Sequence, residues 1–300
     1  MMEVSTVPAK NIVFKVKKPN SWFGAEYNMN IYRGCSHGCI YCDSRSDCYR
    51  NDDFDVVKVK EDALRKIRDD LSRKILRGVV ATGAMSDPYN PIERELKLTR
   101  NALELINAFG FGVAIDTKST LVTRDKDILR DIREHSPVIV KMTVTTADNE
   151  VCSKIEPDAE TSEKRFEAIR ELSDVGIFCG ILMMPILPFI NDTEENIVRI
   201  VKSAAEAGAR FIYPATGMTL RRGNREYFYE KLDESFPGVK DKYIKYYGTR
   251  YQCSSPKSKT LWQVIKNECG KHNILTDMRT IIMNYKSGYS DRQIDMFGLL

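Results

Sequence analysis

Three cysteines stand in one short loop of the chain, at a spacing that lets all three sulfurs face one small object. Cys35, Cys39 and Cys42 follow a C-x3-C-x2-C pattern, and Gly34 and Gly38 flank them. A closed structural zinc site takes four ligands, whereas a [4Fe-4S] cube held by three cysteines keeps one iron free to bind another molecule. Glycines let the backbone turn closely around a bulky group. The loop therefore predicts a [4Fe-4S] cluster with three protein ligands.

Two other interpretations of this loop stay open. A zinc knuckle completed by His37 or Cys48 would make the chain a metal-stabilised binding module rather than an enzyme. A disulfide framework would need an oxidising compartment, and residues 1–18 contain no continuous apolar segment of a signal peptide. The remaining cysteines lack a second tight spacing, and we expect most of them to be small buried hydrophobes; they are Cys48, Cys152, Cys179, Cys253 and Cys269.

The loop resembles the cluster loop of a known enzyme superfamily. With Tyr41 as the aromatic residue, its C-x3-C-x-aromatic-C pattern looks like that of the radical S-adenosylmethionine superfamily, and the string from Tyr32 to Arg45 resembles the spore photoproduct lyase-like branch. The resemblance implies that S-adenosylmethionine binds the free iron. An electron from the cluster then cleaves it to a 5′-deoxyadenosyl radical, which abstracts hydrogen from a carbon. The resemblance also implies an electron donor such as flavodoxin or ferredoxin.

The resemblance places the amino group of S-adenosylmethionine at a turn after the second strand. This turn contains Gly83, Ala84 and Ser86, and its first two residues keep backbone carbonyls accessible to an ammonium group. The Asp-Pro and Asn-Pro pairs that follow are also common in ordinary turns. We favour the cofactor-binding interpretation because the turn is expected at the active end of the sheet.

Five further residues are candidates for binding S-adenosylmethionine. Tyr41 lies in the cluster loop, Lys118 at a strand end could anchor the carboxylate, and Thr145 at the next strand end could hydrogen-bond the ribose. Arg165 resembles the arginine that follows a Glu-Pro pair in this branch, and could grip the carboxylate. Met184 would pack along the adenine. Each has an ordinary alternative, namely a solvated charge, a strand-favouring threonine or a core methionine.

The catalytic residue is not assigned. Spore photoproduct lyase carries a hydrogen-donating cysteine just before a comparable Ser-Asp pair, whereas this chain has Ala84 and Met85 there. The lyase's hydrogen-return step therefore cannot be transferred to this sequence. Tyr32 and Tyr89 are weak candidates for the donor, and such tyrosines are more often packed aromatics.

Two basic segments bear on the substrate. Arg221, Arg222 and Arg225 cluster after the sixth strand, where they could meet nucleic-acid phosphates. Residues 240–251 interleave lysines with tyrosines, as stacking surfaces do, but the tyrosine spacing favours a helix that buries one face. We expect the substrate to be a nucleic acid that is repaired or modified. Radical modification of a small molecule or a protein is the alternative.

The C-terminal segment Gln293–Phe297 resembles the short peptides by which replication and repair proteins bind sliding clamps. A glutamine at the rim, with apolar and aromatic side chains in a pocket, would make such a contact. A last helical turn that packs on its own barrel is the alternative and explains the same apolar residues.

The composition fits a soluble globular protein. Of the 300 residues, 42% are hydrophobic and 29% are charged, and 46 basic against 42 acidic residues leave a net charge of +4. Any nucleic-acid surface must therefore be a local patch. The most apolar run, residues 177–190, contains two prolines and is shorter than the roughly 20 residues of a membrane-spanning helix. We expect a cytoplasmic protein with no membrane association.

The elements that position these residues repeat one rhythm, a short apolar β-rich run followed by an amphipathic helix. The predicted strands are 28–32, 78–83, 111–117, 138–145, 177–184 and 210–214. The predicted helices are 61–76, 98–109, 127–134, 163–174 and 194–207. Glycines at 110, 176 and 208 mark helix ends, and Asp192 with Glu195 resembles a capping box.

Six βα units of this kind predict a parallel sheet curved into a partial (β/α)6 TIM-like barrel, and the resemblance implies the same arc. A doubly wound open sheet is the structural competitor. We expect an irregular lead-in over residues 1–27, the core over 28–216, and a mostly helical C-terminal extension over 217–300 that packs on the core.

Overall fold

The computed structural model describes residues 5–18, 21–51 and 53–289. A seven-stranded sheet in the order β10-β9-β8-β7-β6-β3-β2 forms its centre. Six of the strands run parallel, and β2 (Val13–Lys15) pairs antiparallel with β3 at one edge. The parallel strands are β3 (Tyr27–Met29), β6 (Val79–Thr82), β7 (Gly112–Thr117), β8 (Val138–Thr143), β9 (Phe178–Met183) and β10 (Phe211–Pro214). The predicted open arc of six parallel strands is confirmed.

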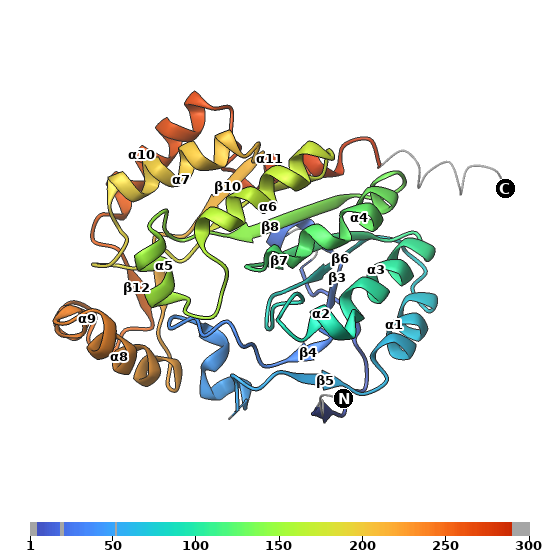
Figure 1. Ribbon diagram of the computed structural model, residues 1–300, viewed down its shortest axis with the longest axis horizontal. Helices are drawn as coiled ribbons and strands as arrows, with labels where there is room; N and C mark the ends of the chain where they lie inside the picture. Colours follow the sequence, from blue (N-terminus) through green and yellow to red (C-terminus); the bar gives the residue numbers. More distant parts are fainter. Residues whose placement is uncertain (1–4, 19–20, 52, 290–300) are drawn as a thin grey trace.

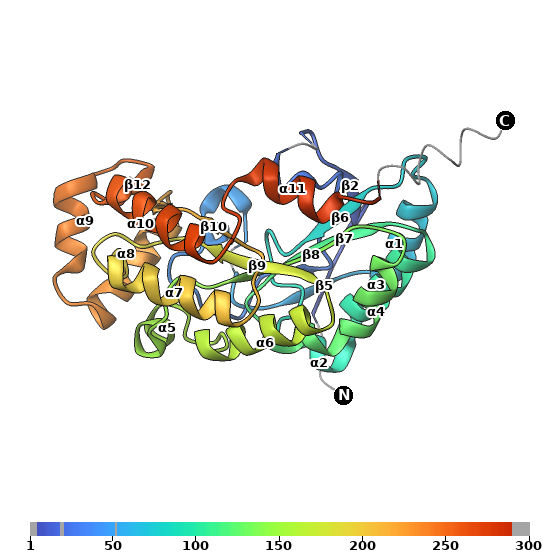
Figure 2. The same ribbon diagram turned by 90° about the horizontal axis from the view of Figure 1, so that it is seen from above.

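Amphipathic helices cover one face of this sheet (Figures 1 and 2). They are α1 (Ala63–Ser72), α3 (Leu98–Ala108), α4 (Lys126–Arg133), α6 (Ser162–Asp174) and α7 (Glu194–Glu206). Each buries an apolar stripe in the main core, for example Ile128, Leu129 and Ile132 of α4. Gly110, Gly176 and Gly208 have φ near +69°, +79° and +78°, which confirms them as the left-handed residues that end three of the helices.

The other face is covered by segments from the two ends of the chain. In Figure 2, α11 (Met278–Lys286) lies across the sheet on the side opposite the helix layer. It packs with the short helix η1 (Trp22–Gly24), and the Tyr285 hydroxyl group donates to the carbonyl of Phe23 at 2.5 Å. Phe23, Phe211 and Ile281 are fully buried here, in one apolar cluster with strand residues that range from Ala81 and Ala114 to Ile139 and Leu182. The concave face is therefore a filled core.

The lead-in is more regular than predicted. It contains β1 (Thr6–Val7) and β2, and the expected boundary at residue 27 falls inside β3. β1 joins β5 (Lys58–Lys60) and β4 (Tyr32–Arg33) in a separate three-stranded sheet. Strands of two or three residues carry too little alternation to be recognised in a sequence. The structure also contains elements that were not predicted: α2 (Glu93–Leu96), α5 (Asn149–Ile155), and the 3-10 helices η2 (Asp43–Arg45), η3 (Asp47–Tyr49) and η4 (Thr120–Asp125).

Two details of the helix ends differ from prediction. Helix α1 ends at Ser72 rather than near Leu76, and Ile75 and Leu76 are exposed. The N-cap of α7 is Thr193, whose hydroxyl group accepts from the backbone N–H of Asn196 at 3.1 Å, so the capping box expected from Asp192 is wrong by one position. The Asp192 carboxylate instead accepts from the Ser255 hydroxyl group at 2.6 Å.

The C-terminal extension combines helices with a short ribbon. It contains α8 (Asn224–Ser235), α9 (Val239–Tyr247) and the antiparallel pair β11 (Gly217–Thr219) and β12 (Gln252–Ser254). Helix α10 (Ser258–Lys271) follows and packs against α7 and the main core. A second apolar cluster joins Phe228 and Tyr243 of this region to Ile40 and Tyr41 of the cysteine loop. The extension therefore buries the loop. The clamp-binding prediction for Gln293–Phe297 lies outside the described residues. Within them, no helix has the length and apolar character needed to cross a membrane.

Candidate active site

The cysteine loop is held on both sides by backbone hydrogen bonds. The N–H of Cys35 donates to the carbonyl of Phe54 at 2.8 Å, and the N–H of Ile40 donates to the carbonyl of Ile155 at 3.0 Å. Gly34 and Gly38 have φ of +84° and +66°. An added Cβ at Gly34 would lie 2.3 Å from the carbonyl oxygen of Val56. The glycines thus allow neighbouring segments to approach the loop closely.

Burial raises the pKa of two of the three cysteines. Burial, with the nearby charges of Asp87 and Cys42, raises the pKa of Cys35 to about 11. Burial also raises the pKa of Cys39, whereas the cation of Lys118 opposes this shift. In the described part of the chain, no three His, Cys, Asp or Glu side chains surround a position suited to a single metal ion. A cube binds each cysteine at a different iron, so a set of three soft thiols on one loop fits it.

The residues that would complete a zinc knuckle have other partners. His37 is buried, and its Nδ1 lies 3.4 Å from the Asp87 carboxylate. Cys48 is exposed, and its sulfur accepts from the Arg221 guanidinium at 3.4 Å. Cys152, Cys179, Cys253 and Cys269 are buried, as expected for most of the remaining cysteines, and Cys48 is the exception.

Asp87 connects the cysteine loop to two strand ends. Its carboxylate accepts from the Thr117 hydroxyl group at 2.7 Å, from the N–H of Lys118 at 2.8 Å and from the N–H of Tyr89 at 2.9 Å, besides the contact with His37. The side chain is 7% exposed. The Asp-Pro turn was visible in the sequence, but these partners were not. Asp87 is therefore a positioning residue that sequence analysis missed.

The turn after β6 is built tightly. Gly83 has φ of +105°, and an added Cβ would lie 2.0 Å from the carbonyl oxygen of Asp116. The Ser86 hydroxyl group donates to the carbonyl of Gly34, so this turn is tied to the cysteine loop. Ser86 thus has a structural partner, and its predicted contact with S-adenosylmethionine stays a prediction.

A buried chain of polar groups lies behind the loop. The Tyr41 hydroxyl group donates to the Glu156 carboxylate, which pairs with the Arg165 guanidinium at 2.6 Å. Arg165 also donates to the carbonyl of Thr143 at 2.8 Å. Burial alone would raise the pKa of Glu156, but Arg165 and Lys118 hold it below its ordinary value. Arg165 is occupied by protein groups in this arrangement, so its predicted grip on a cofactor carboxylate stays a prediction.

Lys118 lies on the loop side of this network. Its Nζ is 5.7 Å from the centre of the Tyr41 ring, and Cys39 and Glu156 raise its pKa against the opposing effect of burial. A cation so close to a cluster cysteine is available to an anionic group bound there.

A cavity of about 510 Å³ opens beside these residues at the carboxyl ends of the strands. Tyr41, Ala84 and Met184, three of the predicted cofactor residues, line it together with Cys42. The extension supplies the opposite wall through Met218, Thr219, Gln252 and Ser254. Thr145 follows β8 at the same edge, and its buried hydroxyl oxygen has no hydrogen-bond partner among the described residues. An unpaired buried hydroxyl group is costly unless a ligand completes it.

The weak catalytic candidates lie elsewhere. The Tyr32 hydroxyl group donates to Glu93 in the main apolar core, and Tyr89 is 1% exposed in the same core. Neither lines the cavity that contains Tyr41 and Ala84. The structure thus gives these tyrosines packing roles.

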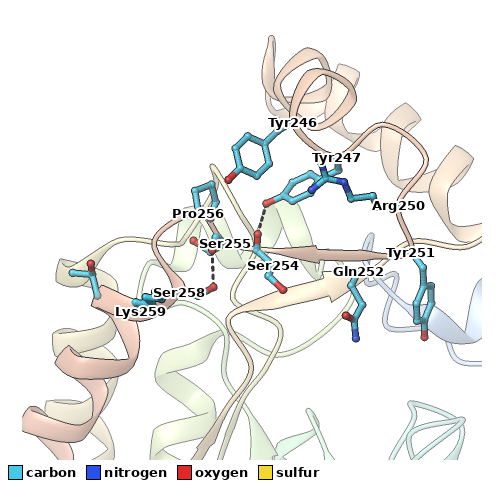
Figure 3. Close-up of a pocket in the computed structure, with 11 residues that line it drawn as sticks. Tyr246, Tyr247, Arg250, Tyr251, Gln252, Ser254, Ser255, Pro256, Ser258 and Lys259 are labelled. Atoms are coloured by element: carbon cyan, nitrogen blue, oxygen red, sulfur yellow. Dashed lines mark hydrogen bonds between the residues drawn. The ribbon is translucent and has the colours of Figure 1, made fainter.

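A wider groove of about 940 Å³ adjoins the cavity (Figure 3). Gln252 and Ser254 line both spaces, and Arg250 and Lys259 are the cations of the groove. Of the tyrosines that were expected to bury one helix face, Tyr243 and Tyr247 are buried, but Tyr246 is 49% exposed and lines the groove.

Each arginine of the predicted cluster has a partner within the protein. Arg225 donates to the carbonyls of Leu220, Gly248, Thr249 and Arg250. Its guanidinium therefore joins the end of β11 to the segment between α9 and β12. Arg221 lies 3.4 Å from Asp43, and the exposed Arg222 lies 3.0 Å from Asp47. Of the two groove cations, Arg250 belongs to the second basic segment that the sequence indicated, residues 240–251, and Lys259 lies beyond it.

Fold and site together define a class of α/β enzymes that hold a metal cluster at the carboxyl ends of parallel strands. A family model described as the radical SAM superfamily matches residues 29–201, and the chain belongs to that superfamily. Over 228 residues it is 30% identical to an uncharacterised protein of Mycobacterium tuberculosis, spanning 74% of this chain and 67% of that one. It is 33% identical over 199 residues to an uncharacterised protein of Methanocaldococcus jannaschii, spanning 65% and 72%.

Solved structures share the fold at low identity. A mutant of spore photoproduct lyase matches with a TM-score of 0.66 and 15% identity, covering 90% of this chain and 78% of the lyase. The radical S-adenosylmethionine methyltransferase TsrM of Kitasatospora setae matches with a TM-score of 0.56 and 12% identity, covering 90% and 61%. These likenesses establish the fold that the sequence predicted.

The cofactors of this enzyme are a [4Fe-4S] cluster and S-adenosylmethionine. When bound, they supply an electron and a means of abstracting hydrogen from carbon. Cys35, Cys39 and Cys42 would hold the cluster, and the cavity beside Cys42 would take S-adenosylmethionine. The chain's own contribution is to fix the loop through Asp87 and Glu156 and to enclose the cavity with the extension.

Proposed function

We propose that this radical S-adenosylmethionine enzyme acts on a nucleic acid, which it binds as a single strand. The observation that carries the proposal is the groove that adjoins the cofactor cavity. Arg250 and Lys259 line it, and no carboxylate side chain is found among its described lining residues. Neither cation has a salt-bridge partner in the described part of the chain. Such a groove favours an anionic ligand.

Aromatic side chains favour a strand with accessible bases. Tyr246 is 49% exposed and Tyr251 is 44% exposed, and both line the groove. Stacking of bases on aromatic rings, combined with cations along the backbone, is the usual way of binding single-stranded nucleic acid. The lyase that shares this fold has been solved with a dinucleoside spore photoproduct, which makes DNA the first ligand to test. Because Ala84 and Met85 replace the lyase's cysteine, the reaction itself is left as repair or modification.

The test uses anaerobically reconstituted enzyme and three oligonucleotides of equal length, namely single-stranded DNA, single-stranded RNA and duplex DNA. We expect a single strand to bind most tightly and to increase the formation of 5′-deoxyadenosine from S-adenosylmethionine. The affinity should fall with salt. Replacing both Arg250 and Lys259 by alanine should lower the salt slope by about 0.7 for each phosphate that the variant no longer neutralises.

The matched control removes two cations from the far end of the molecule. Arg68 and Arg73 are exposed on or next to α1, which lies opposite the β12 region in Figure 1. Their replacement by alanine should leave the slope unchanged. If no strand binds in a salt-dependent way, or if both double variants behave alike, the nucleic-acid proposal is wrong, and a small molecule or protein becomes the substrate to test.

A further inference from the structure

The ribbon of β11 and β12 stands between the cofactor cavity and the groove. Gln252 and Ser254 of β12 line both spaces, with volumes of about 510 Å³ on the inner side and about 940 Å³ on the outer side. A ligand that occupies both spaces must therefore pass the edge of this ribbon. The residues of the ribbon are in a position to select what enters the inner cavity.

The ribbon is fixed in place by its own backbone. Gly217 has φ of +155°, and an added Cβ would lie 2.6 Å from the carbonyl oxygen of Cys253, so glycine permits the close approach of the strands. The Tyr247 hydroxyl group donates to the carbonyl of Ser254 at 2.6 Å, as Figure 3 shows. At one end of the ribbon, Arg225 donates to the carbonyl of Leu220 after β11 at 2.9 Å and to the carbonyl of Arg250 before β12 at 2.7 Å. Side chains on such a fixed element keep a defined direction.

Gln252 presents an unused carboxamide on this element. It pairs in register with Thr219, whose hydroxyl group is engaged with Asp43 at 3.1 Å. Cys253 is buried, so Gln252 and Ser254 share the exposed face of β12. Figure 3 shows the Gln252 side chain extending to the side of β12 away from Tyr246 and Tyr247. Among the described residues, the carboxamide of Gln252 has no hydrogen-bond partner.

The charges of the two spaces differ in a way that orients a nucleotide. The inner cavity is lined by the carboxylate of Asp43 and, in the described part of the chain, by no lysine or arginine. The groove is lined by Arg250 and Lys259. Phosphates are therefore favoured in the groove. The Asp43 carboxylate is paired with Arg221 at 3.4 Å, and a neutral base is the part of a nucleotide that suits the space between S-adenosylmethionine and the ribbon.

We propose that Gln252 is a specificity-determining residue, which reads the edge of one unpaired base as that base passes the ribbon into the inner cavity. A carboxamide donates and accepts at once, and this matches base edges that place a donor beside an acceptor. The sugar-phosphate backbone and the neighbouring bases stay in the groove beside Arg250 and Tyr246. This inference rests on the proposed nucleic-acid function and adds the selection of the base to it.

The test measures binding and does not depend on turnover. The probes are single strands, of the DNA or RNA type preferred in the preceding experiment, in which all positions but one are abasic and the remaining position carries one of the four bases. We expect the reconstituted enzyme to prefer one base over the least favoured by about tenfold. In Gln252→Leu this range should shrink to about twofold, and Gln252→Glu, which keeps the acceptors and loses the donor, should change the order of preference.

Gln263→Leu is the matched control, because Gln263 is an exposed glutamine on α10 whose partner is Asn267 at 2.8 Å. It should keep the full preference, and all variants should retain the same iron content and salt slope. If the unmodified enzyme binds strands without base preference, or if Gln252→Leu and Gln252→Glu keep it, the role of Gln252 is wrong while salt-dependent binding survives. If no strand binds, the proposed function fails as well, so the two failures are distinguishable.

Discussion

The hydroxyl group of Tyr41 donates a hydrogen bond to the carboxylate of Glu156, across a buried contact between the cysteine loop and the segment that follows α5. On its other side Glu156 pairs with Arg165, and both side chains are fully buried. The position of the cluster loop is therefore coupled to an ion pair formed with helix α6. Five predictions test this arrangement and the site around it.

Replacing Arg165 by alanine should leave the Glu156 charge buried without its cation. We expect the free energy of unfolding to fall by about 3–5 kcal/mol and the iron content to fall with it. Lys164→Ala is the control, because Lys164 is exposed and pairs with Glu160 at 3.0 Å; it should cost less than about 1 kcal/mol. Denaturant unfolding under anaerobic conditions measures both. Equal losses of unfolding free energy in the two variants would mean that the buried ion pair contributes no more to stability than the exposed one.

The same ion pair predicts how stability depends on pH. Because the folded state lowers the pKa of Glu156, its contribution is fully present above the ordinary glutamate pKa and is lost as the pH falls through that value towards the folded pKa. Between about pH 5 and pH 3, the unfolding free energy of the cluster-free protein should therefore drop more steeply in the unmodified chain than in Glu156→Gln. Parallel curves for the two proteins would contradict the shift.

Gly83→Ala should damage the turn after β6. The new Cβ would lie 2.0 Å from the carbonyl oxygen of Asp116, in addition to the strain of a φ of +105°. We expect weaker binding of S-adenosylmethionine and a loss of stability several times that of Gly238→Ala, whose φ of +78° has nothing within 4 Å and which should cost about 1 kcal/mol. Thermal unfolding and equilibrium dialysis with the cofactor measure the two effects. Similar values for both variants would show that Asp116 simply moves aside.

Thr145→Val removes a buried hydroxyl group that has no partner among the described residues. Without cofactor, this change should be neutral or slightly stabilising, whereas the affinity for S-adenosylmethionine should fall by about fivefold to tenfold if the hydroxyl group binds the ribose. Thr117→Val is the control with the opposite signature, because its hydroxyl group donates to Asp87 at 2.7 Å and its loss should destabilise the protein by about 1–3 kcal/mol. An unchanged cofactor affinity in Thr145→Val would remove Thr145 from the site.

Replacing Cys35, Cys39 or Cys42 singly by alanine should abolish the visible iron–sulfur absorbance and the cleavage of S-adenosylmethionine, since two thiolates hold the cube poorly. Cys48→Ala should retain both, because Cys48 is exposed and its sulfur contacts Arg221. Iron analysis and absorbance after anaerobic reconstitution decide the matter. Retention in Cys35→Ala with loss in Cys48→Ala would reverse the ligand assignment.

The fold was predictable because its information is local. Each parallel strand is a short apolar run next to a helix with one apolar stripe, and glycine marks three of the helix ends. β11 and β12 were missed because each has three residues and they pair across two helices of the chain. No periodicity in a sequence reports such a pairing.

Only those residues of the site that belong to a recognisable sequence motif could be predicted. The spacing identified the loop with Cys35 and Tyr41, and the resemblance identified Ala84 and Met184. Tyr41, Ala84 and Met184 line one cavity in the structure. The Asp87 contacts and the Glu156 network arise from segments brought together by folding. The groove at Arg250 is lined by residues 246–260, of which the sequence pattern singled out only those up to 251. The sequence showed Arg165 as a cation near a helix start, but only the structure shows which carboxylate it faces.

The packing of α11 against η1 has a consequence for the order in which the molecule is made. The Tyr285 hydroxyl group donates to the carbonyl of Phe23, and the two residues lie 262 positions apart in the sequence. A chain growing from its N-terminus therefore exposes this face of its sheet until α11, residues 278–286, has been synthesised. On the opposite face, the helices up to α7 have emerged some seventy residues earlier, and α10 then packs against α7. The nascent enzyme thus passes through a stage with one covered and one bare face, during which the bare face is the surface that a chaperone would have to protect.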